Sequence, residues 1–249
     1  MNLTWHIVKK DLLRFRWAIA IWAVSFLSYQ LNLDPVLKSR AAEVADYTLR
    51  DYLFLFSIIT YWVLSVAMIV GVVQEDNLVE STVCWRTRPI SPARLLVAKL
   101  LLVEVLFVVI PLCVGWLMNW PARLTSAGIL REFCFPLLMA IGLSLSFAAT
   151  AACTKDLGRC MFTWLAVVAT AFLLTYLMSK IFPALDRHTA SRLIAPKLLI
   201  ICGISTVIGL AVLSSQYLLR RLAFSIALLA SGALGAAVVG AAWTWDFLR

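Results

Sequence analysis

The class of fold follows from residues 95–118, which read LLVAKLLLVEVLFVVIPLCVGWLM. A helix rises about 1.5 Å per residue, so about 20 apolar residues cross a hydrocarbon core of roughly 30 Å. The stretch is long enough for this, and its only charged residues are Lys99 and Glu104. It is therefore predicted to be a transmembrane helix.

Further apolar stretches of the same kind lie on both sides of it, and none of them contains a charged residue. They are residues 17–33, 52–73, 133–153, 161–179, 198–219 and 222–243. A membrane β-barrel would instead show short segments of alternating hydrophobicity. We predict an all-α integral membrane protein with six to seven transmembrane helices.

The composition agrees with this class. Hydrophobic residues make up 63% of the 249 and charged residues 14%, against about 45–50% and about 25% in soluble domains. The net charge of +9 fits basic membrane flanks and anionic headgroups better than nucleic acid, because no basic run with interleaved aromatics occurs. The six cysteines show neither paired nor metal-ligand spacing, which indicates reduced thiols.

Residues 1–16 are predicted to form an amphipathic interfacial helix ahead of the first span. At about 100° per residue, Trp5, Val8, Leu12 and Phe15 fall on one arc, while most basic residues face elsewhere. The alternative is a basic flank that only sets topology. A signal peptide is disfavoured, because the apolar stretch is long and no small-residue cleavage site follows it.

The chain is expected to form a single transmembrane domain, 1–249. Its parts are the interfacial helix 1–16, the first two spans in 17–73, a cytoplasmic loop 74–94 and spans three to seven in 95–243. Basic residues in short loops and span flanks favour a cytoplasmic N-terminus. Only Arg220 and Arg221 separate the last two stretches, which predicts a tight turn, and a native chain that continues past Arg249 stays an open alternative.

Small residues at a spacing of four predict close helix packing in two spans. Gly142 and Ser146 have this spacing, as do Gly232, Ala236 and Gly240. Such spacings let helix backbones approach one another in lipid, although alanine-rich helices also produce them by chance.

The cytoplasmic loop carries the strongest functional signal. Asn77 followed by Glu80 is a helix-start signature, and Pro89 should end that helix. Ser91 and Pro92 then read as an N-cap and first residue of the next helix. The loop is therefore predicted to hold a short exposed helix, lying either on the membrane surface or against a cytoplasmic partner.

In the partner interpretation, an apolar face with a basic rim makes the contact. Its candidate residues are Asn77, Leu78, Glu80, Thr82, Trp85, Arg86, Arg88 and Pro89. Leu78, Thr82 and Trp85 share one face of the helix, with Arg86 and Arg88 at its edge.

This segment is similar to one in a known family. Trp85-Arg-Thr-Arg-Pro-Ile-Ser91, followed by Leu95-Leu96 and Ala98-Lys99-Leu100, resembles the region after the second span of exporter-type ABC transporter permeases (ABC type-2). The tight motif covers only about 26 residues, whereas the layout of helix, spans and long loops covers most of the chain. Two features depart from the family: Ser81-Thr82 stands where Gly-Thr is common, and a seventh apolar stretch exceeds the usual six spans.

The resemblance implies a mechanism and partners. The loop helix would be the coupling helix, seated in a cleft of a separate ABC ATPase subunit that binds ATP and Mg²⁺. A second permease chain, identical or related, would complete the path in a bacterial plasma membrane. The chain itself contains no G-x-x-x-x-G-K-[ST] phosphate loop, so it is expected to be no enzyme and to carry no cofactor.

Glu104 is the other functional candidate, because it lies near the middle of a span, where a carboxylate is costly. It could contact a substrate or bind a proton. Alternatively it makes a structural hydrogen bond to a neighbouring helix, or is a protonated carboxyl without a role. Lys99, five residues earlier, is poorly placed to pair with it.

Two other functions stay open at this point. The chain could be a membrane anchor or scaffold without transport activity, or a proton-coupled carrier that uses Glu104. Enzymatic motifs are lacking, since His6 and His188 are the only histidines and no H-E-x-x-H occurs. A cargo is not identified, although spans rich in Ala, Leu and Trp weakly favour an apolar or amphipathic one.

Overall fold

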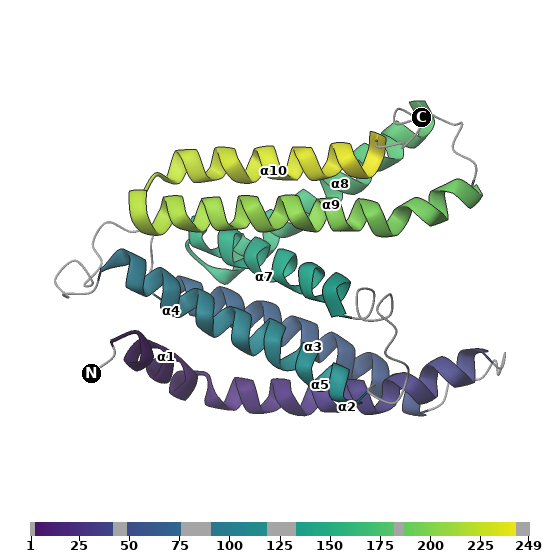
Figure 1. Cartoon of the computed structure of the whole chain (residues 1–249), viewed down its shortest axis with the longest axis horizontal. Helices are drawn as coiled ribbons and strands as arrows, with labels where there is room; N and C mark the ends of the chain where they lie inside the picture. The colour runs from purple at the N-terminus through teal and green to yellow at the C-terminus, as the bar shows by residue number, and fades with distance from the viewer. Residues whose placement is uncertain (1–2, 42–48, 76–90, 119–132, 182–186, 243–249) are drawn as a thin grey trace.

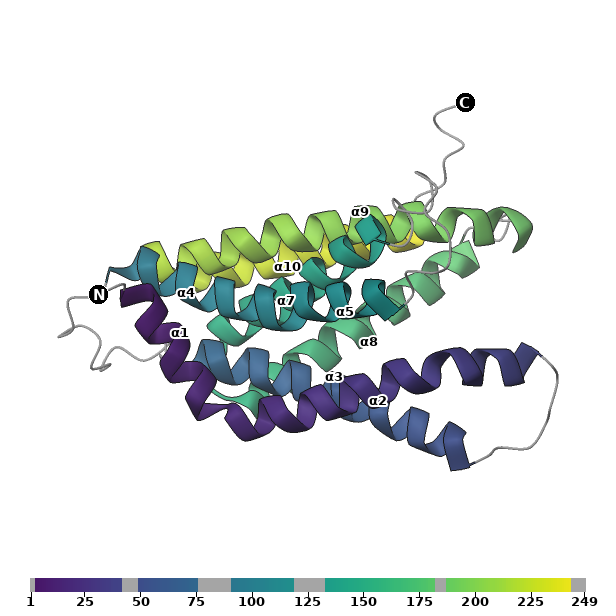
Figure 2. The ribbon, with the colours of Figure 1, turned by 60° about the horizontal axis from the view of Figure 1, so that its bottom comes forward.

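The computed structural model describes residues 3–41, 49–75, 91–118, 133–181 and 187–242, and within these ranges the regular structure is all helical. The helices run alongside one another in an elongated bundle (Figures 1 and 2). They are α1 (Leu3–Arg14), α2 (Arg16–Ala41), α3 (Leu49–Gln74), α4 (Pro92–Glu104), α5 (Ile110–Met118), α7 (Phe135–Cys153), α8 (Leu157–Ile181), α9 (Arg187–Ser214) and α10 (Leu222–Ala242), with π-helical turns η2 (Val105–Val109) and η4 (Ser215–Leu219).

Four helical segments in the described ranges are long and apolar enough to cross a membrane. They are Asp51–Gln74, Pro92–Met118, Phe135–Cys153 and Leu198–Leu219. A fifth arises if α1 and α2, which meet at an angle of 73°, count as one broken span. The all-α class is therefore confirmed, with four to five candidate spans.

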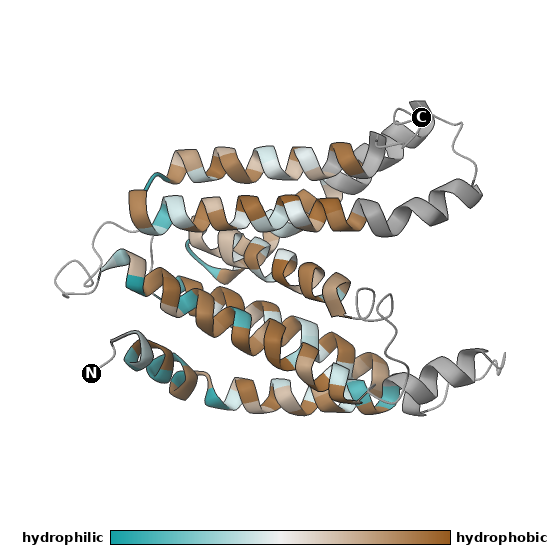
Figure 3. Cartoon of the chain, viewed as in Figure 1, coloured by the Kyte–Doolittle hydropathy of each residue, from teal (hydrophilic) through white to brown (hydrophobic). Residues whose placement is uncertain are grey.

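The outside of the bundle is apolar, as a lipid-facing surface requires. Brown residues cover the long helices in Figure 3, and teal residues mark α1 and the α7–α8 and α9–α10 connections. Large side chains such as Phe162 and Trp17 are 78% and 73% exposed. Water would penalise such a surface, so lipid is the solvent that suits it.

An aromatic cluster joins α2 to α3. The Trp22 ring is stacked on Phe26, tilted against Tyr61 and edge-on to Phe107 of η2. Its indole Nε1 donates a hydrogen bond of 2.7 Å to Ser65 Oγ on α3. The single polar atom of the buried ring is thus satisfied, as an apolar environment demands.

Two π-helical turns interrupt the apolar helices. In η2 the backbone N–H of Ile110 bonds the carbonyl of Val105. The next residue, Pro111, has no N–H to offer, so a regular helix could not continue its hydrogen-bond pattern there. The turn η4 ends at Leu219, and the residue that follows it, Arg220, has left-handed backbone angles (φ 55°). Helix α10 starts two residues after Arg220. The predicted tight turn at Arg220 and Arg221 is confirmed.

Helices α7 and α9 approach each other closely at two glycines. A Cβ added to Gly142 would stand 3.0 Å from the carbonyl oxygen of Cys202. On the other helix, a Cβ added to Gly209 would stand 2.9 Å from Leu145 Cβ and 3.1 Å from its carbonyl oxygen. The predicted role of Gly142 in close packing is confirmed, and Gly232 likewise lies against Ile208. Ser146 instead donates a hydrogen bond to the Gly142 carbonyl within its own helix.

We predict that Gly209→Ala destabilises the protein, whereas Gly203→Ala does not. Overpacking against the Leu145 backbone costs about 1–3 kcal/mol. At Gly203, on the same helix, an added Cβ meets nothing within 4 Å, and alanine favours the helix by up to about 1 kcal/mol. Thermal unfolding in detergent should show a lower Tm for the first variant only, and equal shifts in both would contradict the close contact.

Candidate functional site

The residues predicted to contact a partner lie in the segment 76–90, outside the described residues. They are Asn77, Leu78, Glu80, Thr82, Trp85, Arg86, Arg88 and Pro89. Both flanks of the segment are described, because α3 ends at Gln74, followed by Glu75, and α4 begins at Pro92. The described part of this site is therefore its two flanks, the end of α3 and the start of α4, which we call the base of the segment.

The start of α4 is the expected one. Ser91 has extended backbone angles, its Oγ accepts a hydrogen bond of 3.4 Å from the Arg94 N–H, and Pro92 follows at the first helical position. A serine N-cap with proline at N1 is a strong helix start. The third span thus begins directly at the end of the segment, without a flexible linker.

Five charged side chains meet at this base. Lys99 Nζ lies 2.9 Å from Asp11 Oδ2 and 4.0 Å from Glu75 Oε2. Lys10 and Arg14 contact the other carboxylate oxygen of Glu75 at 2.8 and 2.6 Å. The side chains of Lys99, Asp11 and Glu75 are only 2%, 1% and 7% exposed. Lys10 and Arg14 are 48% and 60% exposed and cover the three buried groups from outside. We refer to the five residues together, after the three at its centre, as the buried charge cluster.

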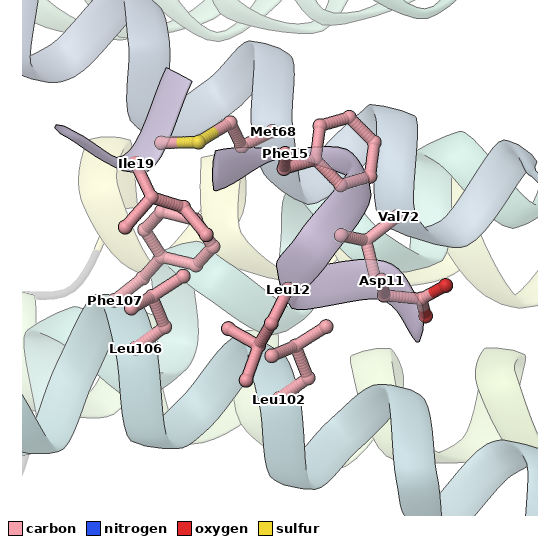
Figure 4. A pocket seen from close by; sticks show the side chains of 9 residues that line it. All are labelled: Asp11, Leu12, Phe15, Ile19, Met68, Val72, Leu102, Leu106 and Phe107. Atoms are coloured by element: carbon pink, nitrogen blue, oxygen red, sulfur yellow. The ribbon is translucent and has the colours of Figure 1, made fainter. Parts of the chain in front are cut away.

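The bend between α1 and α2 places Asp11 in the buried charge cluster. Ile7 and Val8 are buried on the same side of α1, 8% and 4% exposed, and Leu12 and Phe15 line a crevice against Met68 of α3 and Leu102 of α4 (Figure 4). Asp11 lies at the edge of this crevice, which has no room for a water molecule. Apolar packing therefore holds α1 against α3 and α4 and delivers the carboxylate to Lys99.

Charges in such a place are stable only when they are paired. Removing ions from water costs several kcal/mol each, so each charge needs a close counter-ion. Burial raises the pKa of Glu75, but hydrogen bonds and the charges of Lys10 and Lys99 outweigh it and lower the pKa to about 2. Burial also raises the pKa of Asp11, an effect that Lys99 opposes and the neighbouring Glu75 reinforces.

Other connections meet at the same end of the bundle. Gln74 Nε2, next to Glu75, donates to Thr154 Oγ1 at 3.1 Å in the α7–α8 connection. Gln216 Nε2 of η4 approaches Cys153 Sγ at 3.7 Å. The basic residues of these connections therefore lie at the same end as α1. They are Arg94, Lys155, Arg159, Arg220 and Arg221, which is the grouping on which the predicted orientation depends.

Glu104 lies apart from the buried charge cluster. Its Oε1 is 2.8 Å from Ser144 Oγ on α7, and its Oε2 is buried without a hydrogen-bond partner among the described residues. Lys99 contacts Asp11 and Glu75 instead, which agrees with the prediction that Lys99 and Glu104 are poorly placed to pair. The structure thus places Glu104 at a contact between α4 and α7, immediately before η2.

Sequence reasoning missed the partners of Lys99. Asp11 lies beside the predicted apolar arc, between Ile7 and Phe15 around the helix, and a carboxylate among side chains that pack against the core is a signal for a buried cation. Trp5, in contrast, belongs to the predicted apolar arc and is 61% exposed. The apolar arc that contacts the bundle is therefore rotated toward Ile7 and Asp11.

The described part of the chain contains no group of three His, Cys, Asp or Glu side chains that could hold a metal ion. No protein-family model, curated protein or solved structure matches the chain. The fold defines the class as an all-helical protein with four to five candidate membrane spans, and its long apolar helices are those of a membrane-embedded protein.

We predict that Lys99→Met lowers stability by about 3–5 kcal/mol, because it strands the buried Asp11 carboxylate. The double variant Lys99→Met/Asp11→Leu removes both charges and should recover much of that loss. Thermal unfolding in detergent measures both.

Arg159→Gln is the matched control for this experiment. Its ion pair with Asp156 is exposed, at 68% and 57%, and exposed pairs contribute roughly 0–1 kcal/mol. A double variant as unstable as Lys99→Met alone would show that the pairing of the two charges does not matter.

We also predict that Glu75 stabilises the fold down to acidic pH. Its pKa is lowered from 4.5 to about 2, so its contribution is full above about pH 5 and is lost as the pH falls toward about 2. The difference in Tm between wild type and Glu75→Gln should shrink across that interval. A difference that is constant from about pH 7 to about pH 3 would contradict the assigned contacts.

Proposed function

We propose that the chain is the membrane-spanning subunit of an ATP-driven exporter of the ABC type-2 class. In this proposal the segment 76–90 is the coupling helix that docks on a separate ATPase subunit, and ATP and Mg²⁺ bind to that partner. The observation that carries the proposal is the buried charge cluster, which joins both flanks of the segment to α1.

The cluster provides the stiffness that a coupling element needs. A force on the segment would be transmitted to α3 through Glu75 and to α4 through Ser91. Ser91 caps the helix that carries Lys99. Because Lys99 contacts Asp11 of α1 as well as Glu75, these helices move as one body rather than bending at the loop. ATP-driven closure of two ATPases would in this way tilt the spans of each permease chain.

The proposal includes a topology. It takes α8 and α10 as spans in addition to the four to five candidates, giving six to seven, with the N-terminus in the cytoplasm of a bacterium. The basic residues gathered at the α1 end support this orientation through the positive-inside rule. In the plasma membrane α1 would lie in the headgroup layer, with the exposed Trp5 and Leu13 on its membrane side.

The transport path is proposed to need a second permease chain. The hollow lined by Val73, Lys99 and Tyr217 has room for about one water molecule, and the crevice beside Asp11 has less. Neither is wide enough for a cargo. A path between two chains, opened when they tilt apart, fits these dimensions.

The proposal predicts that a tagged preparation in mild detergent retains an ABC ATPase, and that Trp85→Ala/Arg88→Glu loses it. The first substitution removes an aromatic anchor and the second reverses a rim charge, changes that cost several kcal/mol at an interface centre. The bound proteins are identified by mass spectrometry, and the fold of each variant is checked by its Tm.

Arg159→Glu, also at the α1 end of the bundle, is the matched control for charge reversal and should retain the ATPase. Absence of any ATPase from well-folded wild type would contradict the transporter and favour a membrane scaffold. If Trp85→Ala/Arg88→Glu and Arg159→Glu lose the ATPase equally, the segment 76–90 is not the docking site.

A further inference from the structure

Glu104 has an environment that does not suit a carboxylate anion. It lies within the span Pro92–Met118, and its Oε2 is buried without a partner among the described residues. Its only recorded hydrogen-bond partner in the described part of the chain is the neutral Ser144 hydroxyl at 2.8 Å. An ion in the hydrocarbon region without a counter-ion is among the most costly arrangements in a membrane protein.

The charged groups nearby are directed elsewhere. Of the elements packed against α4 and η2, α7 places the neutral Ser144 hydroxyl against Glu104, whereas Tyr217 of η4 lines a hollow with Lys99. Asp11 of α1 and Glu75 at the end of α3 face Lys99, which lies five residues before Glu104 and on a different side of the helix. Among the described residues, therefore, no cation contacts Glu104.

The hydrogen bonds of Ser144 point to the protonation state. Its Oγ lies 2.8 Å from Glu104 Oε1 and 3.0 Å from the carbonyl oxygen of Ile141. A hydroxyl carries one proton, and a carbonyl oxygen can only accept. If each contact is a separate hydrogen bond with a proton of its own, Ser144 donates to Ile141 and the carboxylic acid of Glu104 donates to Ser144.

We propose that Glu104 is a proton-binding site inside the membrane: it holds a proton at neutral pH while α4 and α7 are in contact, and donates it to Ser144 as a hydrogen bond. The proton leaves only when the two helices separate and water reaches the carboxyl, where a water molecule accepts it and leaves a hydrated carboxylate. The adjacent η2 turn supplies an irregular backbone at this contact, as π-helical turns often do at functional sites. This inference depends on Glu104 and Ser144 and does not rest on the proposed ATPase partner.

Infrared spectroscopy of the purified protein tests the protonation state directly. The difference between wild type and Glu104→Gln at neutral pH should contain the carbonyl band of one protonated carboxyl group. Ser144→Ala should shift that band, because it removes the hydrogen-bond acceptor. Ser146→Ala is the matched control, since Ser146 donates to the Gly142 carbonyl, and it should leave the band in place.

Bands of an ionised carboxylate in that difference spectrum would overturn the proposal, and so would a carboxyl band that Ser144→Ala leaves unshifted. Because the Ser144→Ala comparison keeps Glu104 itself, the test stands even if Glu104→Gln fails to fold. Neither outcome depends on whether an ATPase binds.

The pH dependence of stability provides a second readout. A proton held more tightly in the folded than in the unfolded chain stabilises the fold at low pH, and this contribution is lost as the pH rises. Wild type should therefore lose Tm relative to Glu104→Gln as the pH rises from about 4, the ordinary pKa of a glutamic acid side chain, to about 8, with Asp11 and Glu75 common to both. Parallel curves over that range would contradict the proton site.

Discussion

The ammonium group of Lys99 is the constraint on which the arrangement of this end of the bundle depends. It is 2% exposed in an otherwise apolar helix, where an unpaired charge would cost several kcal/mol. Its counter-ion, Asp11, comes from a helix 88 residues away in sequence. To bring that carboxylate within 2.9 Å, α1 must turn away from α2 and fold back under α3 and α4, and the 73° bend meets this requirement.

The same pairing explains why the base of the segment 76–90 is stiff. Glu75 is one residue beyond α3 and is held by Lys10 and Arg14 on one oxygen and approached by Lys99 on the other side. With burial opposed by so many donors, its pKa falls to about 2 and the carboxylate stays ionised at any physiological pH. The two spans that flank the segment are thus joined through a network rather than through a single contact, and networks of buried charges resist local opening better than isolated surface pairs.

Much of the fold could be predicted because local sequence determines it. Apolar length predicted the helices, Ser91 with Pro92 predicted the start of α4, and Arg220 with Arg221 predicted the turn into α10. The missing parts are contacts between distant segments. No residue near Lys99 in the sequence indicates that Asp11 is its partner, and none near Gly209 indicates Leu145. Both contacts arise only when the helices pack. The predicted docking residues from Asn77 to Pro89 stay a prediction, and the described ranges give four to five spans where hydropathy gave six to seven.

The two charged interruptions of the third span are accommodated in opposite ways, and their depth explains the difference. Lys99 lies two turns from the start of α4, within reach of side chains from α1 and of Glu75 beyond the end of α3. It can therefore keep its charge in a paired cluster near the end of the span. Glu104 lies deeper, where the neighbouring helix supplies only a serine hydroxyl. A carboxyl group can respond there by holding a proton and donating it to that hydroxyl as a hydrogen bond. The order of the two residues along the span, cation at the end and acid in the middle, is thus the order that the hydrocarbon core permits.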